Sequence, residues 1–331
     1  MNSFGRIFRI SIFGESHGSC VGIVLDGCPA GLPLDEDDFL SDLRRRKGVG
    51  ITSGVTGRQE SDRPLLQNGI YRGHTTGSPI VILFENRQAD SCAYEDIKDT
   101  PRPGHADWVA LRKFGGFADM RGGGHFSGRL TAPLVAAGVV AKKLLKSIVV
   151  TAKLLEVGGS QEIERMIAEA IKSQDSVGGL VECSVVGIPV GLGEPFFDSL
   201  ESIISHAIFS IPAINGIEFG DGFRACSSRG SLINDSLIET TGKTKTNHSG
   251  GVNGGISNGN ELVFRVSVKP TSSIMAPQLA LNLKLNKLVT ISVRGRHDAC
   301  IALRIPVIVE AMTSVVLADL MLLADALPRV L

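Results

Sequence analysis

Large aromatic side chains are scarce in this sequence, which has one tryptophan and two tyrosines among 331 residues. Proteins that bind single-stranded nucleic acid commonly stack bases on such rings. An excess of one charge is also lacking, because 34 basic side chains balance 34 acidic ones. The chain therefore has no long-range attraction for nucleic acid or for an anionic membrane. We expect no nucleic-acid or membrane partner, and any anion site must be local.

Closely spaced cysteines are also missing. The six cysteines are scattered, and none forms a C-x-x-C pair: Cys20, Cys28, Cys92, Cys183, Cys226 and Cys300. This spacing argues against a disulfide framework and against a zinc site. We expect no bound metal, and we expect reduced thiols in the cytoplasm.

The sequence lacks a long uninterrupted apolar run at either end. Arg6 and Arg9 interrupt the N-terminal stretch, so we expect no signal peptide. Residues 305–331 are apolar enough to consider as a membrane span, but Glu310 and Asp319 lie within them. Charges at such positions are costly in a bilayer, and a buried helix is the better prediction.

Glycine, by contrast, is abundant, with 39 residues. Many glycines fall in predicted loops, where a bare backbone can approach a bound ligand closely. Three histidines occur in or beside such segments: His17 in G-E-S-H-G, His105 in R-P-G-H-A-D and His297 in G-R-H-D. Any one of them could be an ordinary turn histidine. Three together, beside several arginines, indicate proton-transfer chemistry on an anionic substrate.

The predicted elements favour an α+β fold with antiparallel or mixed sheets. Apolar runs predict strands at 7–13, 21–26, 78–84, 181–188, 262–268 and 289–293, and helices at 35–46, 131–146, 160–174, 195–209 and 306–323. Residues 25–32 resemble residues 185–192 at an offset of 160. Chance similarity is one explanation. The other is an internal duplication, which would make 1–331 a single domain of two intertwined halves, about 5–150 and 151–325.

Several segments could hold an anion or a cofactor. The run from Arg121 to Arg129 combines three consecutive glycines and the Ser127 hydroxyl with a helix start, although it matches neither a Walker A motif nor a Rossmann fingerprint. Residues 44–47 are four consecutive cations, which could also simply complement a helix C-terminus. Residues 269–273, K-P-T-S-S, suit a phosphate or a ring edge, but so would an ordinary turn. Residues 294–298 bring arginines beside Asp298, which could also be a surface ion-pair loop.

Together these segments closely resemble the chorismate synthase family. Three long signatures match in order, at residues 13–29, 123–138 and 296–312, with R-P-G-H-A-D, G-V-N-G-G-I-S and K-P-T-S-S between them. The match spans residues 5 to about 325. It implies an α+β sandwich of sheets with helices, an internal duplication and a homotetramer.

The resemblance implies a lyase that converts 5-enolpyruvylshikimate 3-phosphate to chorismate and phosphate, the last step of the shikimate pathway. The reaction is a 1,4-elimination that needs reduced FMN but is redox-neutral overall. No segment of the chain suggests a built-in flavin reductase. We therefore expect an external reductant, with NADPH as a candidate.

The resemblance also assigns catalytic roles. His17 would protonate the departing phosphate, with Ser16 helping to hold it, and Ser127 would contribute its hydroxyl. His105 would supply a proton to the flavin, and Asp298 would assist removal of the ring proton. Two imidazoles and a carboxylate beside arginines suit these roles.

Binding residues follow from the same resemblance. The flavin positions are His125, Phe126, Ser127, Pro212, Ala213, Gly254, Lys269, Pro270, Thr271, Ser272, Ser273 and Arg296, and the substrate positions are Arg45, Arg102 and Arg129. The chain departs from the family in three places. It is shorter around residues 157–178, where other members have a longer insertion. His125 and Phe126 stand where Arg and Ser are common in the family. The loop after Arg46 is longer than usual. Ile51 lies near a position where many members have Arg or Lys, and Arg58 could supply that missing cation.

Two other functions fit the same residues. One is a flavin-free lyase or phosphotransferase that uses the histidines and arginines alone. The other is a non-catalytic glycine-rich binding module for a metabolite or RNA, against which charge neutrality and few aromatics argue.

Overall fold

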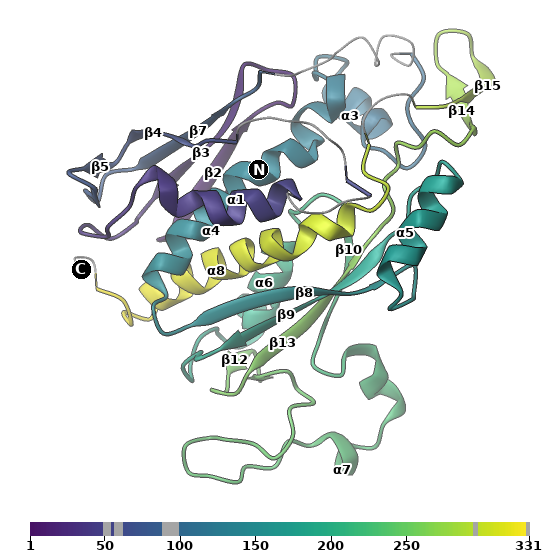
Figure 1. The fold of residues 1–331 in the computed structure, drawn as a ribbon. Coiled ribbons are helices and arrows are strands. Elements are labelled where there is room, and N and C mark those ends of the chain that lie inside the picture. The colour runs from purple at the N-terminus through teal and green to yellow at the C-terminus, as the bar shows by residue number, and fades with distance from the viewer. Residues whose placement is uncertain (49–53, 56–61, 88–98, 294–296, 329–331) are drawn as a thin grey trace.

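Two antiparallel sheets enclose a layer of helices (Figure 1). The computed structural model describes residues 1–48, 54–55, 62–87, 99–293 and 297–328. Helices α1, α4 and α8 lie between the sheets, and a loop-rich lobe that includes α7 projects beyond the second sheet. This arrangement confirms the predicted α+β sandwich.

The N-terminal sheet has the strand order β1-β2-β3-β7-β4. Its strands are β1 (Ser3–Phe4), β2 (Arg9–Gly14), β3 (Cys20–Asp26), β4 (Leu65–Asn68) and β7 (Ile80–Glu85), and a small hairpin of β5 (Ile70–Tyr71) and β6 (His74–Thr75) extends it. In β7, Ile80, Ile82 and Phe84 are buried and alternate with less buried residues. This two-residue period places one face of the strand against the helices.

The C-terminal sheet has the strand order β10-β13-β9-β8. Its strands are β8 (Val149–Val157), β9 (Gly179–Val186), β10 (Ile214–Phe219) and β13 (Leu262–Val268). Two separate hairpins belong to the same half of the chain. β11 (Val252–Asn253) with β12 (Ile256–Ser257) lies between β10 and β13, and β14 (Gln278–Asn282) with β15 (Lys287–Ile291) follows β13.

The helical layer joins the sheets through one core. The α-helices are α1 (Leu40–Lys47), α3 (Asp107–Lys113), α4 (Thr131–Leu144), α5 (Ile163–Lys172), α6 (Leu200–Ile208), α7 (Gly230–Ile233) and α8 (Ile305–Leu323), and the 3₁₀ turns are η1 (Glu36–Phe39), η2 (Arg121–Phe126), η3 (Gly128–Leu130), η4 (Phe196–Asp198), η5 (Gly222–Ser227) and η6 (Ile301–Arg304). Helix α4 packs on the N-terminal sheet and on α8, which in turn packs on the C-terminal sheet. Gly138 of α4 lies against Ala311 of α8, where an added methyl group would overlap that alanine.

Helix α8 is the buried helix that the sequence predicts. Within the described part of the chain, residues 301–323 are the one helical stretch apolar and long enough to cross a membrane, and 94% of its apolar window is buried inside the fold. Its charged residues are used internally. Asp319 accepts backbone hydrogen bonds from Arg6, Ile7 and Phe8 at 2.7–2.9 Å, and so fixes the N-terminal segment.

Most predicted elements are present, with shifted ends. The helix predicted at 35–46 is η1 followed by α1, and the helix predicted at 195–209 is η4 followed by α6. Several elements were not predicted, among them β4, β8, β10, β14 and the short helix α3. The proposed loop at 48–62 lies largely outside the described residues.

The similar segments at 25–32 and 185–192 occupy comparable places. Each follows an inner strand, β3 or β9, and each begins beside a glycine with positive φ, 73° at Gly27 and 81° at Gly187. An added Cβ at Gly27 would overlap the carbonyl oxygen of Ile7, which lies just before β2. An added Cβ at Gly187 would likewise overlap the carbonyl oxygen of Ser147, which lies just before β8. The internal duplication itself stays a prediction.

Candidate active site

A cleft of about 720 Å³ gathers most of the predicted functional residues. Its walls come from the turn after β2, the end of α1, the loop before α3, the glycine-rich η2–η3 segment, the loop before β10, the loop after β13 and the start of η6. Loops from distant parts of the chain thus meet at one place.

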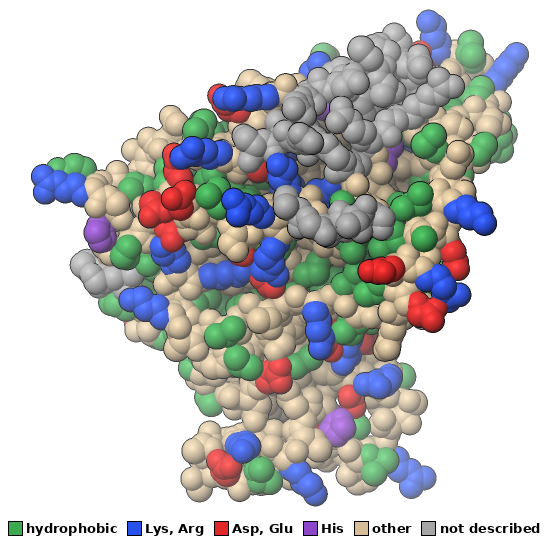
Figure 2. Space-filling view, viewed as in Figure 1, with side chains coloured by type: hydrophobic (Ala, Val, Ile, Leu, Met, Phe, Trp, Pro, Cys, Tyr) green, Lys and Arg blue, Asp and Glu red, His purple; other side chains and the backbone are tan. Residues whose placement is uncertain are grey.

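The cleft is rich in positive charge. Of the described residues that line it, six are Lys or Arg and two are Asp: Arg46, Lys47, Arg102, Arg129, Lys269 and Arg304 against Asp62 and Asp298. By contrast, basic and acidic side chains are interspersed on the face drawn in Figure 2. The cleft therefore has the local excess of positive charge that an anion site in a neutral chain would need.

His17 and Ser16 lie on the turn between β2 and β3, against the glycine-rich segment. Gly122 has a φ of 60°, and a Cβ there would overlap the His17 ring and lie 2.9 Å from Ser16 Oγ. The Ser16 amide donates to the Gly124 carbonyl at 3.1 Å. Only glycine lets the two loops approach this closely, which explains why both motifs are glycine-rich.

His105 is oriented by an ion pair within its own motif. Its Nδ1 lies 2.6 Å from Asp107 Oδ1 and 3.1 Å from Arg102 Nη2. A guanidinium only donates and a carboxylate only accepts, so Nδ1 carries its proton toward Asp107, the nearer partner. The opposite edge of the ring faces Gly123, with Nε2 3.5 Å from where a Cβ would lie.

Asp107 also fixes Arg102. It accepts from Arg102 Nε at 2.7 Å and from Nη2 at 2.8 Å. Burial alone would raise the pKa of Asp107, but the hydrogen bonds from Arg102 and His105 outweigh it and hold that pKa well below its usual range. The carboxylate is therefore a fixed negative charge behind His105. We did not predict Asp107, although its position two residues after the histidine is a usable signal.

Asp298 pairs with Arg304. Arg304 Nη2 donates to Asp298 Oδ1 at 3.1 Å, Arg304 Nε lies 2.8 Å from Asp298 Oδ2 in an ion pair, and Arg304 Nη1 donates to the Lys47 carbonyl at 2.9 Å. This pair orients the carboxylate and ties it to the end of α1. Predicted Arg296 lies outside the described residues, as do Ile51 and Arg58.

Arg46, Asp62 and Arg129 form what we call the cleft cluster. Asp62 Oδ2 accepts from Arg46 Nη2 at 2.7 Å, and Asp62 Oδ1 accepts from Arg129 Nη1. Arg129 Nε also donates at 2.9 Å to the side-chain oxygen of Asn86. The Asn86 amide nitrogen in turn donates to the carbonyls of Glu15 and Gly18, so the cluster is joined to the His17 turn.

The remaining wall contains most of the predicted flavin positions: His125, Phe126, Ser127, Pro212, Ala213, Lys269, Pro270, Thr271, Ser272 and Ser273. His125 Nδ1 bonds the Gly14 carbonyl at 2.9 Å. Lys269 and Ser272 both donate to the Gly104 carbonyl, at 2.9 and 2.7 Å, beside His105. Thr271 Oγ1 is buried and has no hydrogen-bond partner among the described residues.

Two predicted residues lie elsewhere. Arg45 does not line the cleft, because its guanidinium turns to α8 and bonds both oxygens of Glu310 at 2.7 and 2.6 Å. Its neighbour Arg46 faces the cleft instead, since consecutive helical residues point about 100° apart. Gly254 lies in the hairpin between β11 and β12 and is also absent from the lining.

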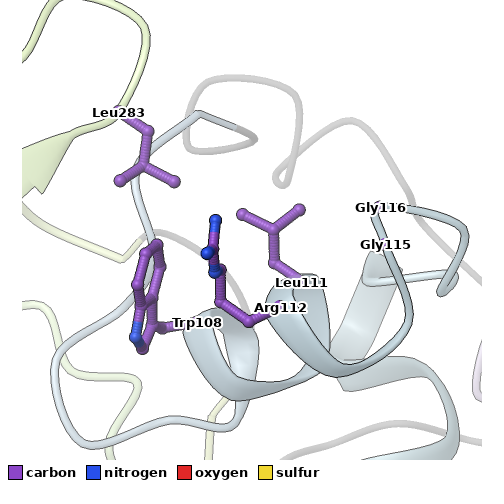
Figure 3. Close-up of a pocket in the computed structure, with 6 residues that line it drawn as sticks. All are labelled: Trp108, Leu111, Arg112, Gly115, Gly116 and Leu283. Atoms are coloured by element: carbon purple, nitrogen blue, oxygen red, sulfur yellow. The ribbon is translucent and has the colours of Figure 1, made fainter.

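A second pocket, of about 490 Å³, lies on α3 (Figure 3). Trp108, Leu111 and Arg112 line it from the helix, and Leu283 faces them from beyond β14. The Arg112 guanidinium lies 5.5 Å from the centre of the Trp108 ring. None of its lining residues is a histidine or a carboxylate, so the larger cleft is the candidate active site.

Comparison with known proteins agrees with an enzyme site of this kind. The fold and the cleft define a class of enzyme that combines acid–base side chains with an anion-binding wall. A family profile described as chorismate synthase matches residues 8–322. The chain belongs to the chorismate synthase family, and it is a carbon–oxygen lyase of chorismate and aromatic amino acid biosynthesis.

Individual relatives support this along the whole chain. A chorismate synthase of Chitinophaga pinensis is 58% identical over 331 residues, covering 100% of this chain and 99% of that protein. One from Pyrococcus abyssi is 43% identical over 343 residues, covering 95% and 96%. A crystal structure of a chorismate synthase superposes with a TM-score of 0.75 at 26% identity, covering 97% of this chain and 93% of that one.

Proposed function

We propose that this cleft eliminates phosphate from 5-enolpyruvylshikimate 3-phosphate to give chorismate, with reduced FMN as cofactor. One observation carries the proposal. His17, His105 and Asp298, far apart in sequence, line a single cleft that six basic side chains also line. Proton donors, a carboxylate and anion-binding groups are the components that this elimination requires.

The residues present fit a flavin. Thr271 Oγ1 is a buried hydroxyl without a hydrogen-bond partner in the described part of the chain, and it is available to a ligand's polar edge. The backbone of Gly122 and Gly123 lies against the rings of His17 and His105, and Lys269 and Ser272 place polar groups at the Gly104 carbonyl beside His105. We propose that residues 125–127, 212–213 and 269–273 hold reduced FMN. When bound, it supplies electron density to the reacting centre and recovers it.

The arginines would hold the substrate's anionic groups. Arg102 and Arg129 keep the roles expected from the sequence, and Arg46 takes the place of Arg45. All three side chains are largely buried, and each has a carboxylate partner that fixes its direction. Fixed guanidinium groups bind phosphate and carboxylate with little loss of conformational entropy.

The acid–base residues would then act on the bound substrate. His17 would give a proton to the departing phosphate, and the buried Ser16 hydroxyl would help to hold that group. In its imidazolium form His105 would offer the proton on Nε2, because the Nδ1 proton is directed to Asp107. Asp298 would take up a proton at a carboxylate oxygen that Arg304 orients.

The assembly, location and reductant are proposals as well. We propose a homotetramer, because large apolar side chains are exposed, among them Phe196 at 87% and Phe197 at 94%. We also propose a cytoplasmic enzyme with an external reductant. Cys20, Cys28, Cys183, Cys226 and Cys300 are free thiols in the described part of the chain, which suits a reducing compartment. Light scattering on the purified protein tests the tetramer.

The decisive experiment is an anaerobic assay of phosphate release from 5-enolpyruvylshikimate 3-phosphate. We expect turnover with chemically reduced FMN and none with oxidised FMN or without flavin. Turnover without flavin would support the flavin-free lyase instead. Retention of nucleic acid at physiological salt, with no turnover, would support the binding module.

A further inference from the structure

Asp62 is a buried carboxylate that no part of the proposed mechanism uses. Its side chain is 2% exposed, and one oxygen contacts each guanidinium of the cleft cluster. Its backbone has a φ of 47°, a left-handed conformation uncommon for residues other than glycine. A strained and buried acid beside a binding wall needs a reason.

Charge balance supplies that reason. Arg46 and Arg129 are 9% and 3% exposed at the side chain, and arginine does not lose its proton in proteins. Two buried guanidinium groups side by side repel each other unless an anion lies between them. Asp62 is that anion. Burial alone would raise its pKa, but the charges of Arg46 and Arg129 outweigh it and hold the pKa below its usual value.

The cluster keeps binding capacity after this pairing. Two guanidinium groups and one carboxylate leave one net positive charge on the cleft wall. Arg129 is also held by the side-chain oxygen of Asn86 and by the Glu85 carbonyl, so its plane is fixed. Arg46 Nε is buried and has no hydrogen-bond partner among the described residues. The cluster is rigid, carries net positive charge and retains a donor.

We propose that Asp62 is a positioning residue, which holds Arg46 and Arg129 side by side so that together they receive one anionic group of the substrate. This inference rests on the proposed function, because it assigns that group to 5-enolpyruvylshikimate 3-phosphate. Asp62 acts through the arginines and takes no part in the proton transfers.

The test compares Asp62→Asn with Asp42→Asn. Asp42 is a matched control, since it too pairs with two cations, Arg45 at 3.3 Å and Lys142 at 2.7 Å, but it lies outside the cleft. Calorimetry measures binding of 5-enolpyruvylshikimate 3-phosphate, and separately of inorganic phosphate, to each protein. We expect Asp62→Asn to raise the substrate Kd about 10- to 100-fold, because the two arginines would no longer be aligned for charge-assisted hydrogen bonds to the substrate. We expect Asp42→Asn to change the substrate Kd less than about twofold.

Two further measurements separate positioning from a merely structural role. Binding of FMN to Asp62→Asn should stay within about twofold, and KM should rise more than kcat falls. In an Arg46→Ala background, Asp62→Asn should have a smaller effect on the substrate Kd, because one of the two arginines that Asp62 holds side by side is gone and no pair is left to align. If Asp62→Asn does not fold, Asp62→Glu should fold and bind the substrate with intermediate affinity, since it keeps the charge but displaces it.

Several results would overturn the inference. Unchanged substrate binding in Asp62→Asn would do so, and tighter binding would mean that the carboxylate competes with the substrate. A uniform loss of substrate and FMN binding, or full additivity with Arg46→Ala, would reduce Asp62 to a structural residue. Failure of the unchanged enzyme to release phosphate would contradict the proposed reaction instead, and the binding measurements would still decide the role of Asp62.

Discussion

Two clusters of basic side chains and carboxylates lie on different faces of α1 and differ in charge balance. The cleft cluster has two cations and one anion. The second, which we call the helix cluster, has two of each: Asp42, Arg45, Lys142 and Glu310. In the helix cluster Glu310 also accepts the Ala152 amide at 3.0 Å, so that α1, α4, α8 and β8 are joined. A balanced cluster is suited to holding elements together, whereas an unbalanced one retains attraction for an anion.

The largest expected effect comes from the acid–base residues beside the cleft cluster. His17→Ala and His105→Ala should each reduce kcat by roughly 10²–10⁴, the range for a lost general acid or base. Binding of FMN should persist in both. Anaerobic turnover with reduced FMN measures this, and a rate near that of the unchanged enzyme would remove the residue from the mechanism.

Glu310→Gln should break the helix cluster and affect stability rather than chemistry. It leaves Arg45 and Lys142 facing an uncharged, buried amide. We expect the free energy of unfolding to fall by about 2–4 kcal/mol. This loss is smaller than that on removing one partner from a fully buried ion pair, because the Arg45 side chain is 44% exposed. Urea unfolding measures it. If kcat of the folded variant changes by more than about threefold, the helix cluster contributes to catalysis and not only to stability.

Loss of the carboxylate behind His105 should have an intermediate effect. Asp107→Asn removes the negative charge behind His105 and replaces one of the two oxygens that accept from His105 Nδ1 and Arg102 with an NH2 donor. We expect kcat to fall about 10- to 100-fold, less than on removing the imidazole itself. Steady-state kinetics across pH checks this. An unchanged rate and pH profile would mean that Asp107 does not orient the histidine.

The neighbouring arginines give the sharpest comparison. Arg46→Lys keeps the charge but loses the planar fork, so the substrate KM should rise about 10-fold. Arg45→Lys, on the other face of α1, should leave KM within about twofold and cost less than about 1 kcal/mol of stability, because that pair is partly exposed. Equal effects of the two substitutions on KM would contradict the assignment of Arg46 rather than Arg45.

The smallest effect is a shared acid sensitivity. Asp62, Asp107 and Glu310 all have a pKa below the ordinary value in the folded state. A lowered pKa adds stability that is fully present above the unfolded-state pKa, about 4, and is lost as the pH falls through the folded-state value. Thermal stability should therefore be level above about pH 5 and fall below about pH 4. If thermal stability falls less at acid pH in Glu310→Gln than in the unchanged protein, the difference is the contribution of Glu310. An identical fall would mean that other groups cause the acid sensitivity.

Sequence patterns were sufficient for much of the fold because apolar periodicity is local. The strands at 21–26 and 262–268, and the buried helix from about 306 to 323, were predicted within a few residues. Strand β8 was missed although Val150 and Val157 are buried, because its outward residues include apolar ones such as Val149 and blur the alternation. Helix α3 was missed because a short exposed helix with Trp108 has no clear apolar face.

The sequence by itself determined which residue types are available: glycine-rich turns bearing His17 and His105, a cation-rich segment before Gly48, and Asp298 beside arginines. Only the tertiary structure decided their partners. The two faces of α1 separate Arg45 from Arg46, and Asp62 reaches Arg129 across 67 positions of chain. Partners of this kind depend on how loops meet after the helices and sheets have packed, and no local pattern encodes that long-range geometry.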